Sequence, residues 1–525
     1  MGVAQVLSRA QLGLDAPLVQ IEAHLGSGLP GFSIVGLPAQ VVRESRERVR
    51  SAILNAGYEF PPGRITVNLA PVELAKEGGR YDLPVALALL LASGQLRLRT
   101  DLYPECYGEL GLGGELRPVR GLLLAAAHAA RAGHDLIVPA ADLAEVRLTR
   151  HRRAFGFRGL AAVCAFLAGA PREAESSPAG DPVLVLNTGQ YLSLEDVKGQ
   201  WRAKRALAIA AAGGHSLLMV GPPGSGKSML ATRLPGLLPP LTEAEAMEVA
   251  GIASISAQGF DPARWGQRPF RAPHHAASAN AIIGGGSRLR AGEISLAHRG
   301  VLFLDELPEF DRRVLEALRE PLETGAIHLA RTAGRLELPA EFQLVAAMNP
   351  CPCGYLGDET RTCRCGPLRI QRYRDRISGP LLDRLDLQIE VPRVELPALQ
   401  PGAEQECPPS VAGSPAVAVA TAVHEARARQ LQRQNCCNAR LDHAGISAHC
   451  RARPAALRLL ERVAGRFGLS ARAYHRLLKV ARTIADLQAA ALITPEHVGE
   501  AASLRLAAAL DAATGPWIPG NPRPP

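Results

Sequence analysis

Gly221-Pro-Pro-Gly-Ser-Gly-Lys-Ser228 is the stretch that decides the fold of this chain. It follows the apolar run Ser216-Leu-Leu-Met-Val220 and precedes the helix-forming Met229-Leu-Ala-Thr-Arg233, which gives the order strand, glycine-rich turn, helix. The glycines allow consecutive backbone N–H groups to converge on a polyphosphate, and the helix start adds its dipole. Lys227 is expected to reach the β- and γ-phosphates, and the Ser228 hydroxyl to bind Mg²⁺. The pattern predicts an α/β fold around a nucleotide site formed by Gly221, Pro222, Pro223, Gly224, Ser225, Gly226, Lys227 and Ser228.

A second apolar strand ends in two carboxylates. Val301-Leu-Phe-Leu304 is apolar throughout and is followed by Asp305 and Glu306, as expected for a strand buried on both faces of a parallel sheet. Asp305 would hold Mg²⁺ together with Ser228, and Glu306 would orient and polarise the attacking water. Taken alone, the pattern also fits a strand end capped by acids, a reading that the preceding phosphate loop disfavours.

The composition is that of a globular protein with a modest excess of positive charge. The chain has 525 residues, 47% of them apolar, and a formal net charge of +9. These values predict about three to four domains and favour a polyanionic partner such as DNA. The longest apolar run, Leu83 to Ala92, is far shorter than the roughly 20 residues of a membrane span. We therefore expect a cytoplasmic protein with no membrane partner and with reduced cysteines.

Residues 1–172 are predicted to form a first, mixed α/β domain. Its expected elements are the strands 18–25, 64–69 and 135–138, the helices 41–55, 83–93 and 121–132, and a glycine-turned hairpin at 108–119. This order resembles the Lon-type peptidase fold, a ribosomal-protein-like α/β module that works with a serine and a lysine. Here Arg80 or Asp82 stands where the serine should be, and Leu123 takes the lysine's place. Without an activatable hydroxyl and its base there is no acyl transfer, so the domain is expected to be non-catalytic.

Composition and periodicity divide the rest of the chain. The segment 173–190, rich in Pro, Ser and acids, is predicted to be a linker, and 396–416, rich in Pro, Gly, Ala and Glu, a loose connector. Residues 191–395 between them carry the nucleotide motifs. Residues 417–514 have helical periodicity and are predicted to form a helical lid, followed by a disordered tail at 515–525. The helices expected after the connector are 416–434, 455–467, 471–489 and one that begins at Thr494.

Four further motifs accompany the phosphate loop. The chain contains Asp196-Val-Lys-Gly-Gln200, Arg271-Ala-Pro-His-His275, Gly292-Glu-Ile-Ser-Leu-Ala-His-Arg-Gly300 and Ile377-Ser-Gly-Pro-Leu-Leu-Asp-Arg-Leu-Asp386. Together they resemble the magnesium-chelatase-like AAA+ ATPases, specifically the YifB/ComM group, over essentially the whole chain. The resemblance implies ATP and Mg²⁺ as cofactors and a homo-oligomeric ring, most simply a hexamer. ComM-type members are similar to hexameric DNA helicases that promote branch migration during natural transformation, whereas many members carry the name of a magnesium-chelatase subunit.

The resemblance also assigns roles beside the nucleotide. It places the adenine pocket just upstream of the helix 201–212, at Val197, Lys198, Gly199 and Gln200. A plain helix N-terminal turn is the alternative for this segment. Asn349, at the end of an apolar strand, looks like sensor 1, the polar group that holds water near the γ-phosphate. An Asn that caps the turn before Pro350 is the alternative.

Two arginines are assigned to the γ-phosphate by the same resemblance. Arg384 stands at the position of the arginine finger, which a neighbouring subunit supplies to neutralise charge on the transferred phosphoryl group. A surface salt bridge is the alternative for Arg384, and Arg376 is the second choice for the finger. Arg472 resembles the sensor 2 arginine, which is expected to reach back to the γ-phosphate of its own subunit. The expected catalytic set is Lys227, Asp305, Glu306, Asn349, Arg384 and Arg472.

Arginines also stand near the tip of a predicted hairpin. The segment 326–339 has the pattern of two strands around a Thr-Ala-Gly turn, with Arg331 and Arg335 beside the turn. In the helicase-type clade of AAA+ proteins a hairpin at this place projects into the pore. Arg331 and Arg335 are therefore candidates for contact with single-stranded or branched DNA. A plain extension of the sheet with solvated arginines is the alternative.

Cysteines and histidines form two more groups. Four cysteines lie within fifteen residues after Asn349 and can close a tetrahedral zinc site: Cys351, Cys353, Cys363 and Cys365. Because the C-x-C spacing is less usual than C-x-x-C, an unliganded reduced loop is the alternative. His274 and His275 precede a small-residue stretch, and we interpret them as part of a loop that contacts neighbouring subunits or DNA.

The sequence thus favours an ATP-hydrolysing hexameric motor that acts on DNA, a ComM-type branch-migration helicase in transformation or recombination. The alternative is a chelatase-type ATPase that remodels a separate metal-insertion partner, although the sequence contains no integrin-like partner domain. An active ATP-dependent protease is disfavoured by Arg80, Asp82 and Leu123.

Overall fold

The computed structural model describes residues 2–37, 39, 42, 44–170, 175–176, 191–285, 290–331, 334–358, 360–394 and 416–505. The chain divides into two compact units. The first comprises Met1–Asn187, Glu243–Gly266 and Ala330–Leu338, and the second comprises Thr188–Thr242, Gln267–Leu329 and Pro339–Pro525. Of the predicted linker, connector and tail, only residues 175, 176 and 416 lie among those described, and the domain boundaries stay predictions.

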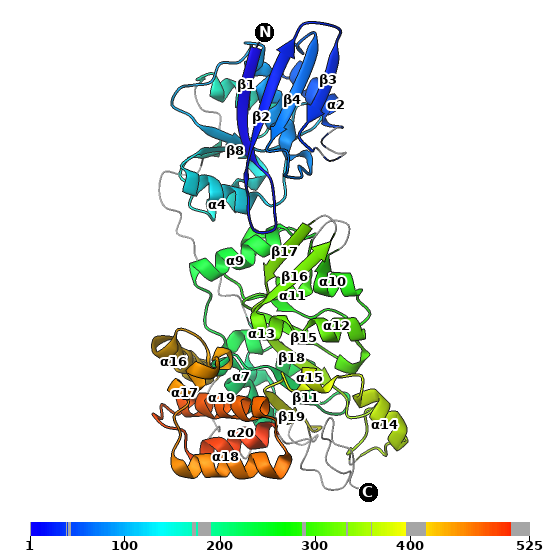
Figure 1. The fold of residues 1–525 in the computed structure, drawn as a ribbon, viewed down its shortest axis with the longest axis vertical. Helices are drawn as coiled ribbons and strands as arrows, with labels where there is room; N and C mark the ends of the chain where they lie inside the picture. Colours follow the sequence, from blue (N-terminus) through cyan, green and yellow to red (C-terminus); the bar gives the residue numbers. More distant parts are fainter. Residues whose placement is uncertain are drawn as a thin grey trace. The chain divides into compact units, whose positions relative to one another are not determined.

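An eight-stranded sheet forms the centre of the first unit, in the order β10-β9-β8-β5-β1-β2-β4-β3 (Figure 1). Its strands are β1 Gly2–Arg9, β2 Leu18–Gly26, β3 Gly31–Val35, β4 Arg64–Ala70, β5 Pro104–Cys106, β8 Asp135–Pro139, β9 Ala154–Phe157 and β10 Glu175–Ser176. In β2 every second residue is buried, beginning with Val19 and Ile21, because one face of the strand packs on the core. The predicted strands 18–25, 64–69 and 135–138 are confirmed.

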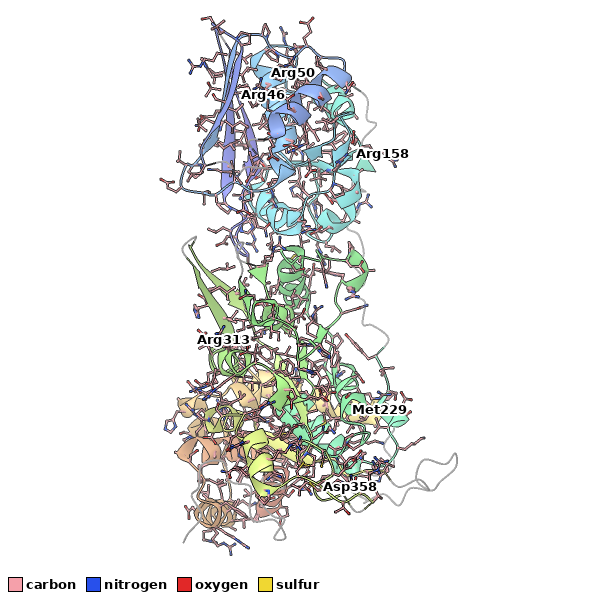
Figure 2. All side chains as sticks on the ribbon, turned by 90° about the vertical axis from the view of Figure 1, so that its right-hand side faces the viewer. Arg46, Arg50, Arg158, Met229, Arg313 and Asp358 are labelled. Carbon is pink, nitrogen blue, oxygen red and sulfur yellow. The ribbon has the colours of Figure 1, made fainter. Side chains whose placement is uncertain are left out.

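Helices cover this sheet. They are α2 Ser45–Asn55, α3 Asp82–Ala92, α4 Leu122–Ala132, α5 Leu143–Arg147 and α6 Leu160–Leu167, and α9 Glu243–Ser254 also belongs to the first unit. The residues from Asp82 to Leu90 of α3 are all buried, and the helix packs on β1 and β2. The exposed face of α2 carries Arg46 and Arg50 (Figure 2). The predicted hairpin is present as β6 Glu109–Leu110 and β7 Leu116–Arg117.

The three positions that the sequence comparison sets against a Lon-type dyad have structural contacts in the first unit. Asp82 is buried and accepts from the Arg48 guanidinium at 2.7 Å. Arg80 donates to the Arg120 carbonyl and, at 3.1 Å, to the side-chain oxygen of Gln11. Leu123 is fully buried in α4. Each side chain is thus held in the interior by packing, hydrogen bonds or an ion pair.

Two acidic side chains near the start of α5, the buried Asp142 and the half-buried Glu145, contact the segment where α4 begins. The Asp142 carboxylate accepts from the Val119 N–H at 2.9 Å, and the Glu145 carboxylate accepts from the Leu123 N–H at 3.2 Å. Burial raises the pKa of Glu145 from 4.5 to about 7, and the charge of Asp142 adds to this. Burial also raises the pKa of Asp142 to about 6.

We predict that Glu145→Gln stabilises the first unit at pH 8 and not at pH 4.5. Because the folded-state pKa of Glu145 is raised, stability is greatest below its unfolded pKa and falls as the pH rises towards 7. Removing the charge should raise the local unfolding free energy at pH 8 by on the order of 1–2 kcal/mol. Hydrogen exchange of the α4 and β8 amides measures this, with the exposed Glu47→Gln on α2 as control. A gain at pH 4.5 as large as at pH 8 would contradict the burial argument.

The second unit contains a five-stranded, wholly parallel sheet in the order β12-β15-β18-β11-β19. Its strands are β11 Leu217–Val220, β12 Phe270–Arg271, β15 Val301–Leu304, β18 Gln343–Met348 and β19 Leu387–Glu390. All residues of β15 and β18 are buried, because helices cover both faces of such a sheet. The helices are α7 Trp201–Gly213, α8 Lys227–Ala231, α10 Ala279–Ile283, α11 Glu293–Leu296, α12 Arg312–Ala317, α13 Pro321–Thr324, α14 Pro367–Arg374 and α15 Gly379–Leu382.

The register of this sheet brings the predicted motifs to one edge. Val220, the last residue of β11, pairs with Met348, and Leu304, the last of β15, pairs with Ala346. The chain leaves β11 into the phosphate loop, β15 into Asp305 and β18 into Asn349. Since the carboxyl ends of parallel strands meet at the same edge, these three segments are neighbours. The mixed α/β prediction with a parallel sheet is confirmed, and the strand order is consistent with an AAA+ ATPase.

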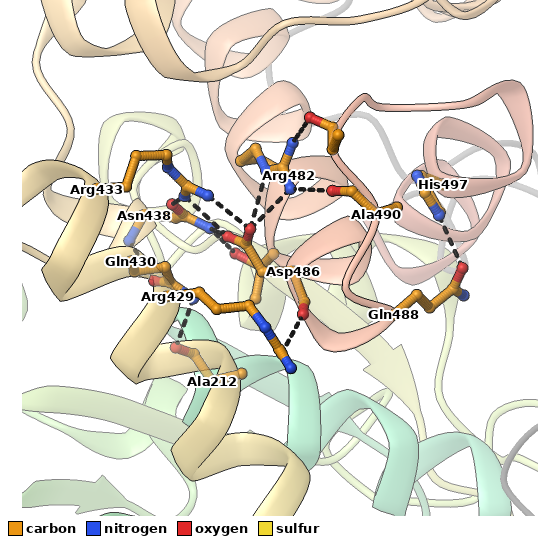
Figure 3. A network of polar contacts seen from close by, with 12 residues as sticks. Ala212, Arg429, Gln430, Arg433, Asn438, Arg482, Asp486, Gln488, Ala490 and His497 are labelled. Atoms are coloured by element: carbon orange, nitrogen blue, oxygen red, sulfur yellow. Dashed lines mark hydrogen bonds and ion pairs between the residues drawn. The ribbon is translucent and has the colours of Figure 1, made fainter.

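The described residues 416–505 contain five α-helices: α16 Ala416–Gln434, α17 His443–His449, α18 Pro454–Phe467, α19 Ala471–Leu487 and α20 Pro495–Arg505. Asp486 joins α16 to α19 through a buried polar network (Figure 3). It accepts from Arg433 of α16 at 2.7 Å, from Asn438 at 2.8 Å and from Arg482 at 2.7 Å. Burial alone would raise the pKa of Asp486, but these donors hold it below its usual value. The ionised carboxylate therefore fixes α16 against α19.

Besides β6–β7, the described residues contain two more two-stranded sheets. The strands β13 Gly284–Gly285 and β14 Arg290–Ala291 pair with each other, and so do β16 Ala326–Arg331 and β17 Gly334–Pro339. The predicted hairpin at 326–339 is thus confirmed as secondary structure. Among the described helices, none has the length and apolar character needed to cross a bilayer.

Candidate nucleotide-binding site

The phosphate loop joins β11 to α8, which begins at Lys227. Gly224 and Gly226 have φ angles of +77° and +91°, a conformation that suits glycine because it has no Cβ. The Lys227 ammonium donates to the carbonyls of Gly221 at 2.7 Å and Pro222 at 2.9 Å, and to the Asn349 side-chain oxygen at 3.3 Å. Burial lowers the pKa of Lys227, while Asp305 and Glu306 oppose this shift. The Lys227 ammonium is therefore held against the phosphate loop, close to the carboxylates of Asp305 and Glu306.

The two predicted Mg²⁺ ligands are in direct contact. The Ser228 hydroxyl of α8 donates to a carboxylate oxygen of Asp305 at 2.7 Å. A hydroxyl and a carboxylate are the oxygen ligands that P-loop proteins offer to Mg²⁺, which keeps several waters of its own. The residues present therefore fit a magnesium ion bound with a nucleotide.

Glu306 follows Asp305 in a left-handed backbone conformation, with φ of +53°. Its N–H donates to the Asp305 carboxylate at 3.0 Å, and its own carboxylate lies 3.2 Å from the Nδ1 of His275. The His274 and His275 rings are 4.2 Å apart. The sequence pattern predicts a contact of both histidines with other subunits or DNA, and it gives no sign of the contact between His275 and Glu306.

Asn349 comes directly after β18 and reaches Lys227 through its side-chain oxygen. The Tyr373 hydroxyl of α14 is hydrogen-bonded to the Asn349 backbone, and burial raises the pKa of Tyr373 to about 12. The Asn349 side chain is thus held beside the phosphate loop, where the sensor 1 prediction puts it.

The predicted adenine segment lies next to the same loop. Gln200 donates through Nε2 to the Ser225 carbonyl at 3.3 Å and to the Pro392 carbonyl at 2.6 Å. Gly199 and Gln200 have φ angles of +59° and +55° and form the turn before α7, while Val197 is buried. The contact between Gln200 and the loop supports the assignment of Val197, Gly199 and Gln200, whose role towards adenine stays a prediction.

Arg384 lies at the amino-terminal ends of the strands, whereas the phosphate loop lies at their carboxyl ends. It precedes β19, whose first residue Leu387 pairs with Leu217 at the start of β11. The Ser216 hydroxyl donates to the Arg384 carbonyl at 2.9 Å. Because the four residues of β11 span about 13 Å, the phosphate loop is at the far end of that strand. Arg384 is therefore remote from the nucleotide site of its own chain.

The side chain of Arg384 is buried and paired. It lies 2.8 Å from the Glu323 carboxylate and donates to the Pro380 carbonyl at 2.7 Å. Arg476 of α19 donates to the Arg384 carbonyl at 2.8 Å, which ties this segment to the C-terminal helices. Arg376, the second choice for the finger, lies elsewhere, at 2.5 Å from the Glu309 carboxylate.

Arg472 shares the partner of Arg384. Its guanidinium lies 3.2 Å from the same Glu323 oxygen. This position differs from the expectation that Arg472 reaches the γ-phosphate of its own subunit. The reason is that α19 begins beside Arg384, at the amino edge of the sheet, and not beside the phosphate loop.

Comparison with known proteins agrees with this geometry. The family model described as magnesium chelatase, subunit ChlI, matches residues 193–399, and two further models, subunit ChlI of Mg-chelatase and the ChlI C-terminal part, match residues 21–142 and 413–505. The uncharacterized protein YifB of Salmonella typhimurium is 49% identical over 506 residues, which cover 96% of this chain and 97% of YifB. The competence protein ComM of Haemophilus influenzae is 46% identical over 507 residues, which cover 96% and 98% of the two chains. The chain belongs to the magnesium-chelatase-like YifB/ComM family.

One more distant similarity is to a replication protein. The DNA replication licensing factor Mcm6 of Drosophila melanogaster is 29% identical to this YifB/ComM protein over 99 residues, 19% of the chain and 11% of Mcm6. The resemblance inferred from the five motifs is confirmed by the full-length matches to YifB and ComM.

The hairpin of this YifB/ComM protein is only partly described. The strands β16 and β17 are defined by their backbone, but the side chains of Arg331 and Arg335 lie outside the described residues. Their role in DNA binding stays a prediction.

The predicted cysteine cluster is present in this YifB/ComM protein. The sulfur atoms of its four members all lie within 4.8 Å of one another: Cys351, Cys353, Cys363 and Cys365. Two pairs that are ten residues apart in the chain have therefore been brought together by the loop between them.

Proposed function

We propose that the protein is an ATP-hydrolysing ring motor, most simply a hexamer, that acts on DNA as a branch-migration helicase. The observation that carries the proposal is the position of Arg384. It lies at the amino-terminal ends of the strands, and its own phosphate loop lies at their carboxyl ends. An arginine finger at this position can therefore serve only a neighbouring chain. A site completed in this way requires an oligomer.

Each residue of the site has its own role in phosphoryl transfer. Lys227 and the loop N–H groups hold the phosphates, and Glu306 orients the attacking water and accepts its proton. Asn349 hydrogen-bonds that water from the side of Lys227. Ser228 and Asp305 would hold Mg²⁺, which when bound would neutralise charge on the phosphates.

In this proposal Arg384 and Arg472 act across the interface between adjacent subunits. Arg384 leaves Glu323 to neutralise the charge that develops on the γ-phosphoryl group bound by the adjacent subunit. Arg472, which shares Glu323, would move with it and contact the same phosphate in trans. Hydrolysis at one subunit would thus change an ion-pair arrangement in the next.

DNA is the partner that the chain and its relatives support best. The chain has a formal net charge of +9, and electrostatic attraction favours polyanions. ComM is named for competence, and Mcm6 for DNA replication. The hairpin β16–β17 offers a place for phosphate contacts through Arg331 and Arg335.

We predict that replacing both Arg331 and Arg335 with Ala weakens DNA binding equally for all sequences. Arginines on phosphates release counterions, so the slope of log affinity against log salt should fall by about one for each phosphate that the variant no longer binds. ATP binding should be unchanged, whereas DNA-stimulated hydrolysis and strand displacement should collapse. The matched control is Arg458→Ala with Arg462→Ala, two exposed arginines of α18. Unchanged DNA affinity, salt slope and unwinding in the hairpin variant would remove the hairpin from the mechanism.

The alternative function is a chelatase-type ATPase that remodels a metal-insertion partner, as the names of the matching family models suggest. The rate of ATP hydrolysis with and without DNA separates the two. Stimulation by branched DNA supports the motor, and a rate indifferent to DNA supports the chelatase type. Proteolysis is disfavoured because Asp82 is ion-paired and buried and Leu123 is buried, so labelled casein should survive incubation with protein and ATP.

A further inference from the structure

Four thiols converge directly beside the nucleotide site. The Sγ atoms of Cys351 and Cys353 are 3.3 Å apart, and each lies 3.6 Å from that of Cys363. The sulfur of Cys365 completes the group, in which every pair lies within 4.8 Å. These distances are well above the roughly 2.05 Å of a disulfide bond, and all four residues are free cysteines.

This spacing fits a tetrahedral metal centre. Four sulfurs that each lie about 2.3 Å from a zinc ion are about 3.8 Å from one another. The backbone also donates to the sulfurs, from Cys365 to Cys363 at 3.4 Å and from Tyr355 and Arg364 to Cys353. Backbone N–H groups of the loop thus point at two of the four sulfurs. A closed set of four cysteines is a usual ligand set of structural zinc.

The surrounding charge is suited to such a centre. A zinc ion with four thiolates has a net charge of −2, and the segment around the last two cysteines carries positive side chains. They are Arg361, Arg364, Arg369, Arg372 and Arg374. Arg374 of α14 donates to the Pro350 carbonyl at 3.2 Å, next to Cys351.

The loop between the cysteine pairs is closed by its own hydrogen bonds. The Asp358 carboxylate, labelled in Figure 2, accepts from the N–H groups of Thr360 at 2.8 Å and Arg361 at 3.0 Å. The Arg361 guanidinium also donates to the Tyr355 hydroxyl at 2.8 Å. The turn therefore returns Cys363 to Cys353, and Arg393, which follows β19, also holds it by donating to the Thr360 hydroxyl at 2.9 Å.

The cluster also packs against the phosphate loop. Gly354 has φ of +85°, and a Cβ added there would lie 2.6 Å from the Pro223 ring. Cys351 is buried and stands two residues after Asn349, whose side chain contacts Lys227. Any movement of the cysteine loop would thus act on Pro223 and Asn349 together.

We propose that Cys351, Cys353, Cys363 and Cys365 bind one structural Zn²⁺, and that this metal holds Pro223 and Asn349 in place for nucleotide binding and turnover. The first half stands on the geometry of the thiols alone. The second half rests on the proposed nucleotide site. Zinc here is a support for the site, with no open position for a substrate.

The test begins with metal analysis of the purified, untagged full-length protein. We expect about one zinc per chain, X-ray absorption with four sulfur neighbours at about 2.3 Å, and the visible bands of a tetrahedral cobalt thiolate when Co²⁺ replaces zinc. Essentially no zinc together with no cobalt thiolate bands would overturn the metal site. Nitrogen or oxygen neighbours in the absorption spectrum would also overturn it. These measurements use the wild-type chain and do not depend on how well a variant folds.

Variants test whether the metal holds Pro223 and Asn349 in place. Cys363→Ser with Cys365→Ser should lose zinc, and kcat/KM for ATP should fall on the order of 100-fold, because a displacement of about 1 Å at a catalytic site can cost that much. The control is Cys436→Ser with Cys437→Ser, which lie outside the cluster and should keep both zinc and activity. A zinc-free cluster variant with full ATPase activity would overturn the supporting role. If the wild type holds zinc but hydrolyses no ATP, the proposed function fails while the metal site stands.

Discussion

Lys227→Ala should greatly weaken ATP binding, whereas Glu306→Gln should bind ATP and fail to hydrolyse it, because the two side chains have different contacts in the site. The Lys227 ammonium is buried and held at the loop by the Gly221 and Pro222 carbonyls, so it makes charge-assisted contacts with the phosphates from the first moment of binding. Each such hydrogen bond is worth about 1.5–3 kcal/mol, and without them ATP binding should weaken by at least about 100-fold. The substitution also leaves the Asn349 side-chain oxygen without this donor.

Glu306 has a different place in the same reaction. Its side chain is half exposed and contacts His275 rather than any loop residue, so it acts on water and not on the phosphates. A glutamine of the same shape keeps the position but cannot accept the proton, which should cost about 10²- to 10⁴-fold in kcat.

The measurement is ATP affinity by calorimetry beside steady-state hydrolysis for each variant. Met229→Ala is the matched control, because this residue follows Ser228 in α8 and its side chain, labelled in Figure 2, is exposed. It should leave affinity and rate close to those of the wild type. Equally weakened binding in the Lys227 and Glu306 variants would contradict the assigned roles.

ATP hydrolysis should be restored in rings that mix Arg384→Ala subunits with Glu306→Gln subunits. Arg384→Ala alone should lower kcat by about 10³- to 10⁵-fold, and Glu306→Gln alone should be nearly inactive. When the two proteins are mixed, some interfaces pair the intact Glu306 of one subunit with the intact Arg384 of its neighbour. Those interfaces should hydrolyse ATP, because the structure places Arg384 beyond reach of its own phosphate loop.

The experiment follows hydrolysis against the mixing ratio, with subunit exchange verified by native mass spectrometry. Activity should rise from near zero at either end to a maximum at intermediate ratios. Glu306→Gln mixed with Lys227→Ala is the control that tests whether mixing alone restores activity, since neither can complete a site with the other's catalytic groups. If mixed rings form and Arg384→Ala with Glu306→Gln gives no rescue at any ratio, Arg384 does not act in trans.

The local elements of the fold could be predicted from periodicity and capping. The helix expected at 416–434 is α16 at the same residues, and the strand expected at 18–25 is β2. In β2 alternating residues face the core, and α19 begins at a Ser470 cap whose hydroxyl accepts from the Ala473 N–H at 3.2 Å. The helix α17, His443–His449, was missed because seven residues show too little periodicity.

Contacts between distant segments could be predicted only where a motif carried them. The contact of Ser228 with Asp305 was expected because P-loop chemistry demands both. The contact of His275 with Glu306 was not expected, since nothing in a pair of histidines indicates a partner some thirty residues away. Arg472 was assigned to its own nucleotide from a resemblance in sequence, but which edge of the sheet a helix reaches depends on packing.

The cysteine cluster shows a further limit of prediction from sequence. The C-x-C spacing left a zinc site and an unliganded loop both open, because spacing does not determine whether a loop folds back. The Asp358 turn closes that loop and brings Cys363 to Cys351 and Cys353. The structure thus turned an open pattern into a defined cluster.

The most direct test of the motor account is ATP-dependent branch migration. A labelled three-strand or four-strand DNA junction is incubated with the full-length protein, Mg²⁺ and ATP, and the released strand is followed with time. We predict strand release that requires ATP, stops with Glu306→Gln and is accompanied by ATP hydrolysis faster with the junction than without DNA. Hydrolysis that proceeds at the same rate with and without DNA, with no strand released from any junction, would contradict the account.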